Sequence, residues 1–211
     1  MKKFFTNIPL QVKDGLISYH YEAVGNEKLN IEGKTSYPIL TAISGYVEKG
    51  EEFRLIAVCP DSQDGRRNRD ILETETNALC EHKGFHFRGV ETVSSQTSER
   101  VADHAALFQK LIEFAEDDDE LFACMTYGTK LQSHILTMAV QYAYRVKQNA
   151  SISCIVYGYI DRTTGKPGDL STYDAYVYDE TALIHMDEIV RMLAERKVSD
   201  PKAIIDNILG M

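Results

Sequence analysis

The chain has 211 residues, of which 44% are apolar, and a net charge of −9 from 32 acidic and 23 basic side chains. This length and composition predict one globular domain over residues 1–211 and exclude a largely disordered chain. The negative charge disfavours binding along DNA or long RNA, because the surface repels a phosphate backbone. A small anionic ligand remains compatible, since helix-end amides and one lysine act at close range.

The patterns that mark export, membrane insertion and metal binding are missing from this sequence. No segment approaches the roughly 20 apolar residues of a membrane span, and Asn7 and Pro9 interrupt the apolar N-terminal run. The four cysteines have no CxxC spacing, so we expect buried thiols in a reducing compartment, with disulfide or metal roles as the alternative. We therefore expect a cytoplasmic protein with no membrane partner and no metal.

Short apolar runs alternate along the chain with amphipathic stretches of helical length. The pattern predicts strands over 2–5, 53–60, 85–93, 121–128 and 151–161, separated by helices over 37–49, 67–83, 98–116 and 129–149. In the third of these helices, we expect one apolar face formed by Val101, Ala105, Phe108, Ile112 and Ala115.

Five strands joined by helices imply right-handed crossovers and a mainly parallel sheet. The runs 55–59 and 153–158 are apolar at successive positions, which is typical of strands covered on both faces. We therefore predict a Rossmann-like three-layer α/β sandwich.

The pattern changes after residue 161. A turn-rich segment leads to an alternating strand over 171–179, which predicts an antiparallel hairpin at the sheet edge or reaching toward a partner. Helices follow over 182–196 and from Pro201 onward. Residues 12–36 fit either a long loop or a short hairpin inserted after the first strand.

Open parallel sheets bind ligands outside the carboxyl ends of their strands, where adjacent connections run to opposite faces. The rule selects residues 6–11, 61–69, 94–98 and 126–132. The last segment is the most informative, because Gly128 permits a sharp turn and Lys130 places a positive charge at a helix N-terminus. The alternative interpretation is that Thr129 only caps its helix and Lys130 is solvated.

The other three segments are less specific. Asn7 and Pro9 also fit an ordinary turn, and the charged tract 61–69, which could lend Arg66, Arg67 or Asn68 to a ligand, fits a solvated loop better. Ser95 or Gln96 could face the crevice. There is no GxGxxG, GxxxxGK[ST], HExxH or GxSxG motif, so we expect no dinucleotide, P-loop, zinc-protease or serine-hydrolase site. We interpret His104 and His134 as surface or satisfied side chains.

The segment 124–130, Cys-Met-Thr-Tyr-Gly-Thr-Lys, is similar to a family signature. It resembles the Asp-x-Thr-His-Gly motif at the end of a central strand in a subgroup of CARF (CRISPR-associated Rossmann-fold) proteins. FFTNIPLQ, the apolar strand before DSQDG, IVYGYID and YDETALIHMDEIVRMLA extend the resemblance over most of the chain. Cys124 stands where the family has the acid and Tyr127 where it has the histidine, whereas Thr126, Gly128, Thr129 and Lys130 match the motif.

The resemblance implies a homodimer that binds a cyclic oligoadenylate, with the tetra-adenylate favoured, in type III CRISPR antiviral defence. Similar proteins usually carry an effector domain, and we expect a stand-alone form without one. Such a sensor would cleave the bound ring, regulate transcription or switch a separate effector protein. The candidate ligand-binding positions are Thr6, Asn7, Ile8, Pro9, Gln11, Ser95, Gln96, Thr126, Tyr127, Gly128, Thr129 and Lys130.

Ring cleavage would require neither a metal nor another cofactor, because the ribose 2′-OH can attack the adjacent phosphate once the two are held in line. In such a ring nuclease, Lys130 would stabilise the phosphate, while Thr6 or Thr129 would orient the nucleophile or the leaving oxygen. Two other hypotheses stay open. One is a small-molecule enzyme that binds a mononucleotide or flavin in the same crevice, and the other is a non-catalytic regulatory subunit.

Overall fold

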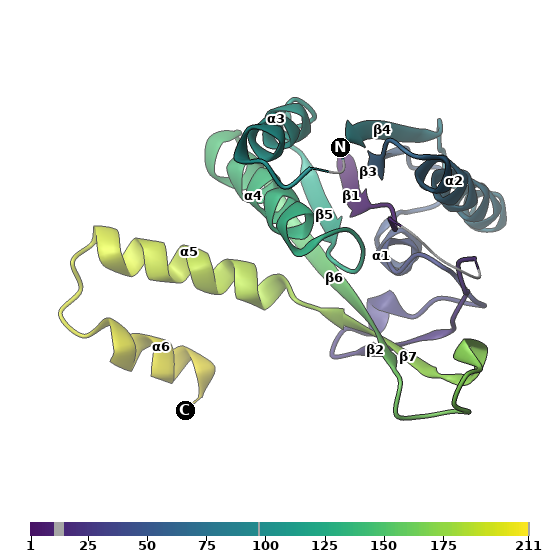
Figure 1. Cartoon of the computed structure of the whole chain (residues 1–211). Coiled ribbons are helices and arrows are strands. Elements are labelled where there is room, and N and C mark those ends of the chain that lie inside the picture. The colour runs from purple at the N-terminus through teal and green to yellow at the C-terminus, as the bar shows by residue number, and fades with distance from the viewer. Residues whose placement is uncertain (11–14, 97, 211) are drawn as a thin grey trace.

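A seven-stranded sheet forms the centre of the computed structural model, which describes residues 1–10, 15–96 and 98–210 (Figure 1). The strands are β1 Lys2–Asn7, β2 Tyr21–Val24, β3 Phe53–Pro60, β4 Val90–Ser95, β5 Glu120–Cys124, β6 Ser151–Asp161 and β7 Asp174–Asp179. The α-helices are α1 Ile39–Tyr46, α2 Gln63–Lys83, α3 Val101–Ile112, α4 Lys130–Val146, α5 Thr181–Glu195 and α6 Pro201–Leu209. Two 3₁₀ turns, η1 Glu27–Leu29 and η2 Leu170–Thr172, complete the described elements.

The strand order is β2-β7-β6-β5-β1-β3-β4, and only β6 and β7 pair antiparallel. This confirms the predicted α/β fold with a mainly parallel sheet. The chain builds outward from β1 through β3 to β4, then returns to β5 on the other side of β1. The direction of winding therefore reverses between β1 and β5, and open α/β sheets bind ligands at such a point.

Helices cover both faces of the sheet. On one face, α1 and α2 pack against Phe4, Leu55 and Phe122, and on the other, α3 and α4 pack against Phe5 and Ile56. Successive strand residues alternate between the two cores because side chains in a strand point to opposite faces. The result is the predicted three-layer sandwich (Figure 1).

The C-terminal antiparallel hairpin forms as predicted, but it does not occupy the edge of the sheet. Strand β2 pairs in parallel with β7 and is the outermost strand on that side. Without β2, strand β7 would be the outer strand and would expose unpaired backbone groups, and pairing with β2 satisfies them. Residues 12–36 thus contribute a strand and the turn η1 rather than only a loop, and residues 12–14 lie outside the described part.

Several element boundaries differ from the sequence prediction, among them those of β5, α2 and β4. Strand β5 ends at Cys124 instead of residue 128, because the chain turns at Gly128, whose φ is 89°. Helix α2 begins at residue 63, so the tract predicted as a solvated loop is helical, with the hydroxyl of Ser62 accepting a hydrogen bond from the Gly65 amide. Strand β4 begins at Val90, because Phe87 stacks on Phe53 outside the strand.

The apolar face predicted for α3 is only partly correct, because Phe108, Ile112 and Ala115 pack in the core whereas Val101 and Ala105 do not. Leu107 and Leu111 are the buried residues of this helix, whereas Val101 is 82% exposed and Ala105 is also exposed. The four-residue spacing of the two leucines defines the stripe that faces the sheet.

All four cysteines are free and buried, as predicted. Within the described residues, no helix has both the length and the apolar character that a membrane crossing requires. Helices α5 and α6 extend away from the sheet at the C-terminal end of the chain and form an arm (Figure 1).

Candidate functional site

The candidate site lies at the carboxyl ends of β1, β4 and β5, where α4 begins. The loop after β5 leads directly into α4, with Thr129 as its N-cap. The turn at Gly128 brings the start of this helix against the end of β1. Three parts of the chain that are distant in sequence therefore meet at the reversal point of the sheet.

A capping box organises the first turn of α4. The Thr129 hydroxyl accepts a hydrogen bond from the Gln132 amide at 3.1 Å, and the Gln132 side chain accepts one from the Thr129 amide at 2.9 Å. No described group pairs with the amides of Lys130 and Leu131. These amides therefore remain available at the positive end of the helix dipole.

Gln132 connects the helix to β4. Its side chain is 7% exposed, and its Nε2 donates to the Ser95 hydroxyl at 3.2 Å. The hydroxyls of Ser95 and Thr129 act as acceptors here, so each retains a proton that it can donate to a ligand.

Asn7, the last residue of β1, is the least satisfied polar group of the site. It is 1% exposed, and neither Nδ2 nor Oδ1 has a hydrogen-bond partner among the described residues. Its amide carbon would lie 2.9 Å from a Cβ placed on Gly128, so the two residues are in direct contact. A buried amide without partners costs about 1–3 kcal/mol, and a bound polar ligand or water would remove this cost.

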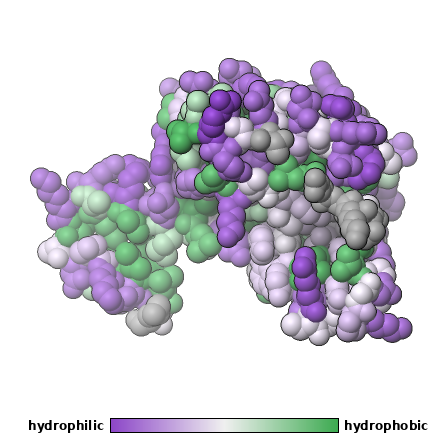
Figure 2. All heavy atoms as spheres, viewed as in Figure 1, coloured by the Kyte–Doolittle hydropathy of each residue, from purple (hydrophilic) through white to green (hydrophobic). Residues whose placement is uncertain are grey.

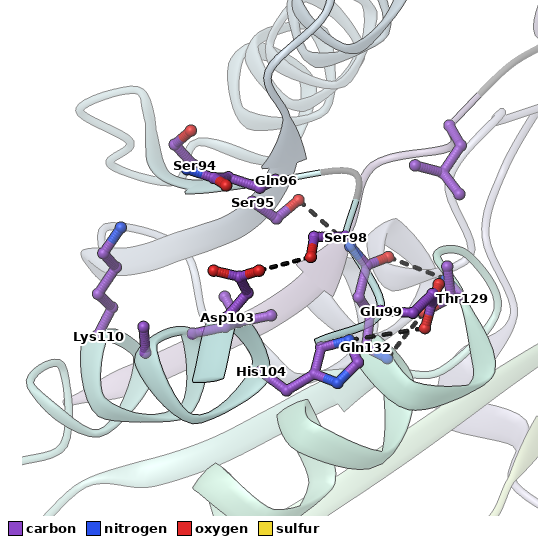
Figure 3. A pocket seen from close by; sticks show the side chains of 13 residues that line it. Ser94, Ser95, Gln96, Ser98, Glu99, Asp103, His104, Lys110, Thr129 and Gln132 are labelled. Carbon is purple, nitrogen blue, oxygen red and sulfur yellow. Dashed lines mark hydrogen bonds and ion pairs between the residues drawn. The ribbon is translucent and has the colours of Figure 1, made fainter. Parts of the chain in front are cut away.

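A cavity of about 90 Å³ opens beside this cluster, between β4, α3 and α4 (Figure 3). Its walls carry hydroxyl, amide and charged groups together with three apolar side chains. The lining residues are Leu10, Ser94, Ser95, Gln96, Ser98, Glu99, Asp103, His104, Ala106, Leu107, Lys110, Thr129 and Gln132. The volume accommodates several water molecules or part of a planar polar group.

The α3 side of the cavity carries paired charges. The Ser98 hydroxyl donates to Asp103 at 2.5 Å (Figure 3). Arg100 donates to the same carboxylate at 3.1 Å. The hydrogen bond from Ser98, together with Arg100, lowers the pKa of Asp103. His104 lies 3.7 Å from Glu99. Asp103 is therefore held as a carboxylate that would repel an anion bound close to this wall.

The structure brings together four of the predicted site residues. Asn7 and Gly128 are in contact, and Gln132 links the Gly128–Thr129 turn to Ser95. Ser95 and Thr129 line the cavity, as does a fifth predicted residue, Gln96, which is exposed.

None of the described residues predicted at the end of β1 lines the cavity, Asn7 included. Thr6 is fully buried and lies on the α1 face of the sheet, because strand side chains alternate and Asn7 points to the other face. Ile8 and Pro9 are buried, and Gln11 lies outside the described residues.

Thr126 and Tyr127 mainly serve the fold. The Thr126 hydroxyl accepts a hydrogen bond from the Gly158 amide, which ties β5 to β6. The Tyr127 hydroxyl donates to the Ser36 carbonyl oxygen at 2.7 Å, and its ring packs edge-on against Tyr37. Burial raises the pKa of Tyr127, so the phenol stays neutral at physiological pH.

Lys130 is exposed, does not line the cavity and forms no ion pair with another described residue. Both features of the alternative interpretation are therefore present, since Thr129 caps α4 and Lys130 is solvated. Neither feature prevents a ligand from binding, because the backbone amides of Lys130 and Leu131, which have no described partner, lie on the same exposed turn as the Lys130 side chain.

Several residues of the site are absent from the sequence-based candidates. Gln132 could have been found, because Thr129 and Gln132 have the Thr-x-x-Gln spacing of a capping box. Glu99, Asp103 and Lys110 gave no such signal, since their contribution depends on how α3 crosses the sheet.

No protein-family model matches the chain, and no curated protein sequence matches it either. The chemistry of the site must therefore be judged from its own residues. No group of three or more metal-binding side chains occurs in residues 1–10, 15–96 and 98–210. The available groups are neutral donors and acceptors, helix-end amides and one lysine, which suit a polar or anionic organic ligand.

Proposed function

We propose that this protein is a CARF-like sensor that binds a cyclic oligoadenylate of type III CRISPR defence between two copies of the chain, at the carboxyl ends of β1, β4 and β5. The resemblance of residues 124–130 to the family signature supports this ligand. The observation that carries the proposal is the buried amide of Asn7, which contacts Gly128 and has no hydrogen-bond partner among the described residues. A carboxamide offers a donor and an acceptor side by side, which matches the edge of an adenine or a phosphate with its ribose.

Local electrostatics favour phosphate despite the negative charge of the whole molecule. The amides of Lys130 and Leu131 have no described partner and lie at the positive end of α4. The Lys130 ammonium adds a full charge to the same turn, which is typical of phosphate sites at helix N-termini. Two copies related by a two-fold axis would present this turn twice to a ring that has rotational symmetry of its own.

Ring cleavage is a separate step of the proposal. It would begin with attack of a ribose 2′-oxygen on the neighbouring phosphorus and end with departure of the 5′-oxygen, which leaves a cyclic 2′,3′-phosphate. The proton of the 2′-hydroxyl would pass to solvent water, and water would protonate the leaving 5′-oxygen while the Thr129 hydroxyl donates a hydrogen bond to it. Lys130 would stabilise the phosphate oxygens. Thr6 takes no part in this arrangement, because it is buried on the opposite face of β1.

Thermal unfolding of the full chain with added cyclic tri-, tetra- or hexa-adenylate tests the binding step. A ring that binds should raise the melting temperature, since a ligand at about 100 times its dissociation constant adds about 2.7 kcal/mol. Lys130→Ala should weaken binding at least about tenfold, because a charged hydrogen bond is worth about 1.5–3 kcal/mol. Asn7→Asp should also weaken it, by placing a negative charge beside the phosphate.

Lys147→Ala is the matched control, since Lys147 lies at the opposite end of the same helix, where the helix dipole does not favour an anion. If no ring changes the melting temperature, the proposed ligand is wrong. If a ring binds but Lys130→Ala and Lys147→Ala behave alike, the proposed site is wrong. Chromatography of the incubated ring separates a sensor, which returns it intact, from a ring nuclease, which yields linear products. A yellow preparation with flavin absorbance would instead support the mononucleotide or flavin enzyme.

A further inference from the structure

One face of the sheet is left uncovered beyond β6. On this side α3 and α4 cover β1, β3 and β5, and α5 adds Ile184 against the same core. Strand β6 contributes Ile155 to this core, and Tyr157, two residues later, must point to the same face. Tyr157 is 39% exposed, so the covering helices end before this position.

Four tyrosines occupy the uncovered part of the face. The antiparallel register places Tyr157 opposite Tyr178 and Tyr159 opposite Tyr176, and directly opposed residues share a face. Tyr159 is 41% exposed, and the two tyrosines of β7 are partly exposed. We call Tyr157, Tyr159, Tyr176 and Tyr178 the tyrosine face.

Carboxylates border the tyrosine face. Glu22 of β2 is in register with Tyr176, and Asp174 precedes Tyr176 by two residues, so both lie on the same face. The pKa of Tyr176 is raised, first by desolvation and then by the negative charges of Asp174 and Glu22, which agrees with the placement of both carboxylates beside this tyrosine. Both carboxylates are exposed, and neither forms an ion pair with a described residue.

The arm formed by α5 and α6 also has apolar side chains that no other described element covers. Helix α6 buries none of its residues, and α5 buries only Ile184 and Glu188. A nine-residue helix is marginal alone in water and depends on packing of its apolar side. Hydrophobic side chains gather over this arm in the space-filling view (Figure 2).

A groove of about 220 Å³ runs between the two helices of the arm. Apolar side chains line most of it, namely those of Val190, Leu193, Ala194, Val198, Pro201 and Ile205, together with Lys197. Arg196 and Lys197 form the elbow between α5 and α6, and neither makes an ion pair with another described residue. The arm therefore combines an uncovered apolar groove with unpaired positive charge.

We propose that the α5–α6 arm of one copy packs on the tyrosine face of a second copy, with Arg196 and Lys197 facing Glu22 and Asp174. The inference rests on the proposed function only in that the two copies form the same pair. Two features identify the occupant as a second copy. First, Arg196 and Lys197 of the elbow are opposite in charge to Glu22 and Asp174 beside the tyrosine face. Second, both surfaces belong to the same chain, so a two-fold axis would let each copy cover the tyrosine face of the other.

The apolar surface is concentrated where such an exchange would bury it. Sixteen large apolar side chains are exposed among the described residues, and eight of them lie on β6, α5 and α6. Contiguous exposed apolar surface of this kind marks interaction sites. A stable pair needs about 800 Å² of buried surface on each partner, and one buried aromatic side chain contributes about 150–250 Å².

Sedimentation velocity of the full chain without nucleotide tests the inference. The wild type should sediment with the mass of two chains. Ile208→Asp on α6 should raise the dimer dissociation constant at least about tenfold, since it places a charge in the apolar contact. Val101→Asp is the matched control, because Val101 is an exposed apolar residue on α3, away from both surfaces. It should leave the dissociation constant unchanged.

Charge reversal gives a test that misfolding cannot imitate. The double change R196E with K197E, or E22K with D174K, should weaken the dimer at least about tenfold. All four changes together should restore it, because the signs are complementary again. A monomeric wild type, equal loss in V101D, or no restoration in the fourfold variant would overturn the inference.

The same measurements separate this inference from the proposed function. Sedimentation measures loss of the dimer in the arm variants without any ring present, whereas ring binding is expected to depend on Asn7 and Lys130. If the charge changes weaken and restore the dimer but no cyclic oligoadenylate binds, the arm contact is supported and the proposed ligand is wrong. If a ring binds but neither Ile208→Asp nor the charge changes affect the dimer, the ligand is supported and the arm contact is wrong.

Discussion

Two polar residues of β1, Lys3 and Asn7, are buried in opposite circumstances. The Lys3 ammonium is fully buried and lies 2.7 Å from Asp119, 2.5 Å from Glu116 and 2.7 Å from the Phe114 carbonyl oxygen. All three of its protons therefore have an acceptor. Asn7, at the other end of the same strand, has no described partner for either amide atom. A satisfied group stabilises the fold, whereas an unsatisfied one is available for binding.

Lys3→Met should lower the free energy of unfolding by about 3 kcal/mol, because the carboxylate of Asp119, which is 2% exposed, loses its nearest cation and keeps only the Glu116 amide and the N-terminal ammonium at 3.6 Å. Urea unfolding measures the loss. Lys2→Met is the neighbouring control, and its partly exposed pair with Glu51 should cost less than about 1 kcal/mol. Combining Lys3→Met with Asp119→Leu should recover part of the loss. An equal effect of the two single lysine changes would contradict the role assigned to Lys3.

Gly128→Ala should destabilise the protein and weaken ring binding together. The left-handed φ of 89° costs a non-glycine residue about 1–3 kcal/mol, and the new Cβ would approach Asn7 to 2.9 Å. Gly168→Ala is a matched control, because Gly168 has a φ of 87° and open space around it. Unfolding free energies of the two variants separate backbone strain from the contact with Asn7. Identical unfolding free energies would mean that the Asn7 side chain moves away from the new Cβ without loss of stability.

Among the elements, edge strand β4 is fixed to β3 by a bidentate ion pair. Arg54 donates from Nε and Nη2 to the two oxygens of Glu91, at 2.6 and 2.7 Å. The hydrogen bonds from Arg54 lower the pKa of Glu91 below its ordinary value of 4.5. A lowered pKa in the folded state means that the pair stabilises the protein above pH 4.5, and that this contribution is lost as the pH falls through the folded-state pKa.

The stability advantage of the wild type over Glu91→Gln should therefore shrink as the pH falls from about 5 to about 3. We expect less than about 1 kcal/mol at neutral pH, because both side chains are partly exposed. Melting temperatures across this range measure the difference. Glu113→Gln, at an exposed position without a described ion pair, should show no such trend. A constant advantage of the wild type across the range would argue against the pair.

The sequence predicted the elements that carry strong local signals. Strands β3 and β6 have the predicted bounds, because both are apolar at successive positions and end at turn-forming residues. Strand β2 was missed, since its four residues alternate weakly and it forms only by pairing with the distant β7. The face of α3 was only partly assigned, because Phe108 and Ile112 pack on the core as predicted but the buried Leu107 and Leu111 were not among the predicted residues.

At the scale of the whole molecule, the strand order decides which loops meet. The ends of β1, β4 and β5 were all expected to lie at the ligand-binding edge, and the structure joins them through Asn7, Ser95 and Gln132. The alternation along β1 could have shown that Thr6 and Asn7 face opposite sides. The cavity wall on α3 could not be predicted, because Asp103 and His104 reach the site only through the crossing of α3 over the sheet.

The central position of β1 also determines how the chain can fold during synthesis. Strand β1 is translated before both of its neighbours, and its pairing with β5 at Glu120–Cys124 spans more than half of the chain. Contacts between such distant segments slow folding, because a long loop must close before they form. Phe4 and Phe5 can pair with β3 early, but the other side of β1 stays open in the nascent chain until β5 emerges from the ribosome. During this interval the open side of β1 would be a target for a chaperone that binds apolar segments.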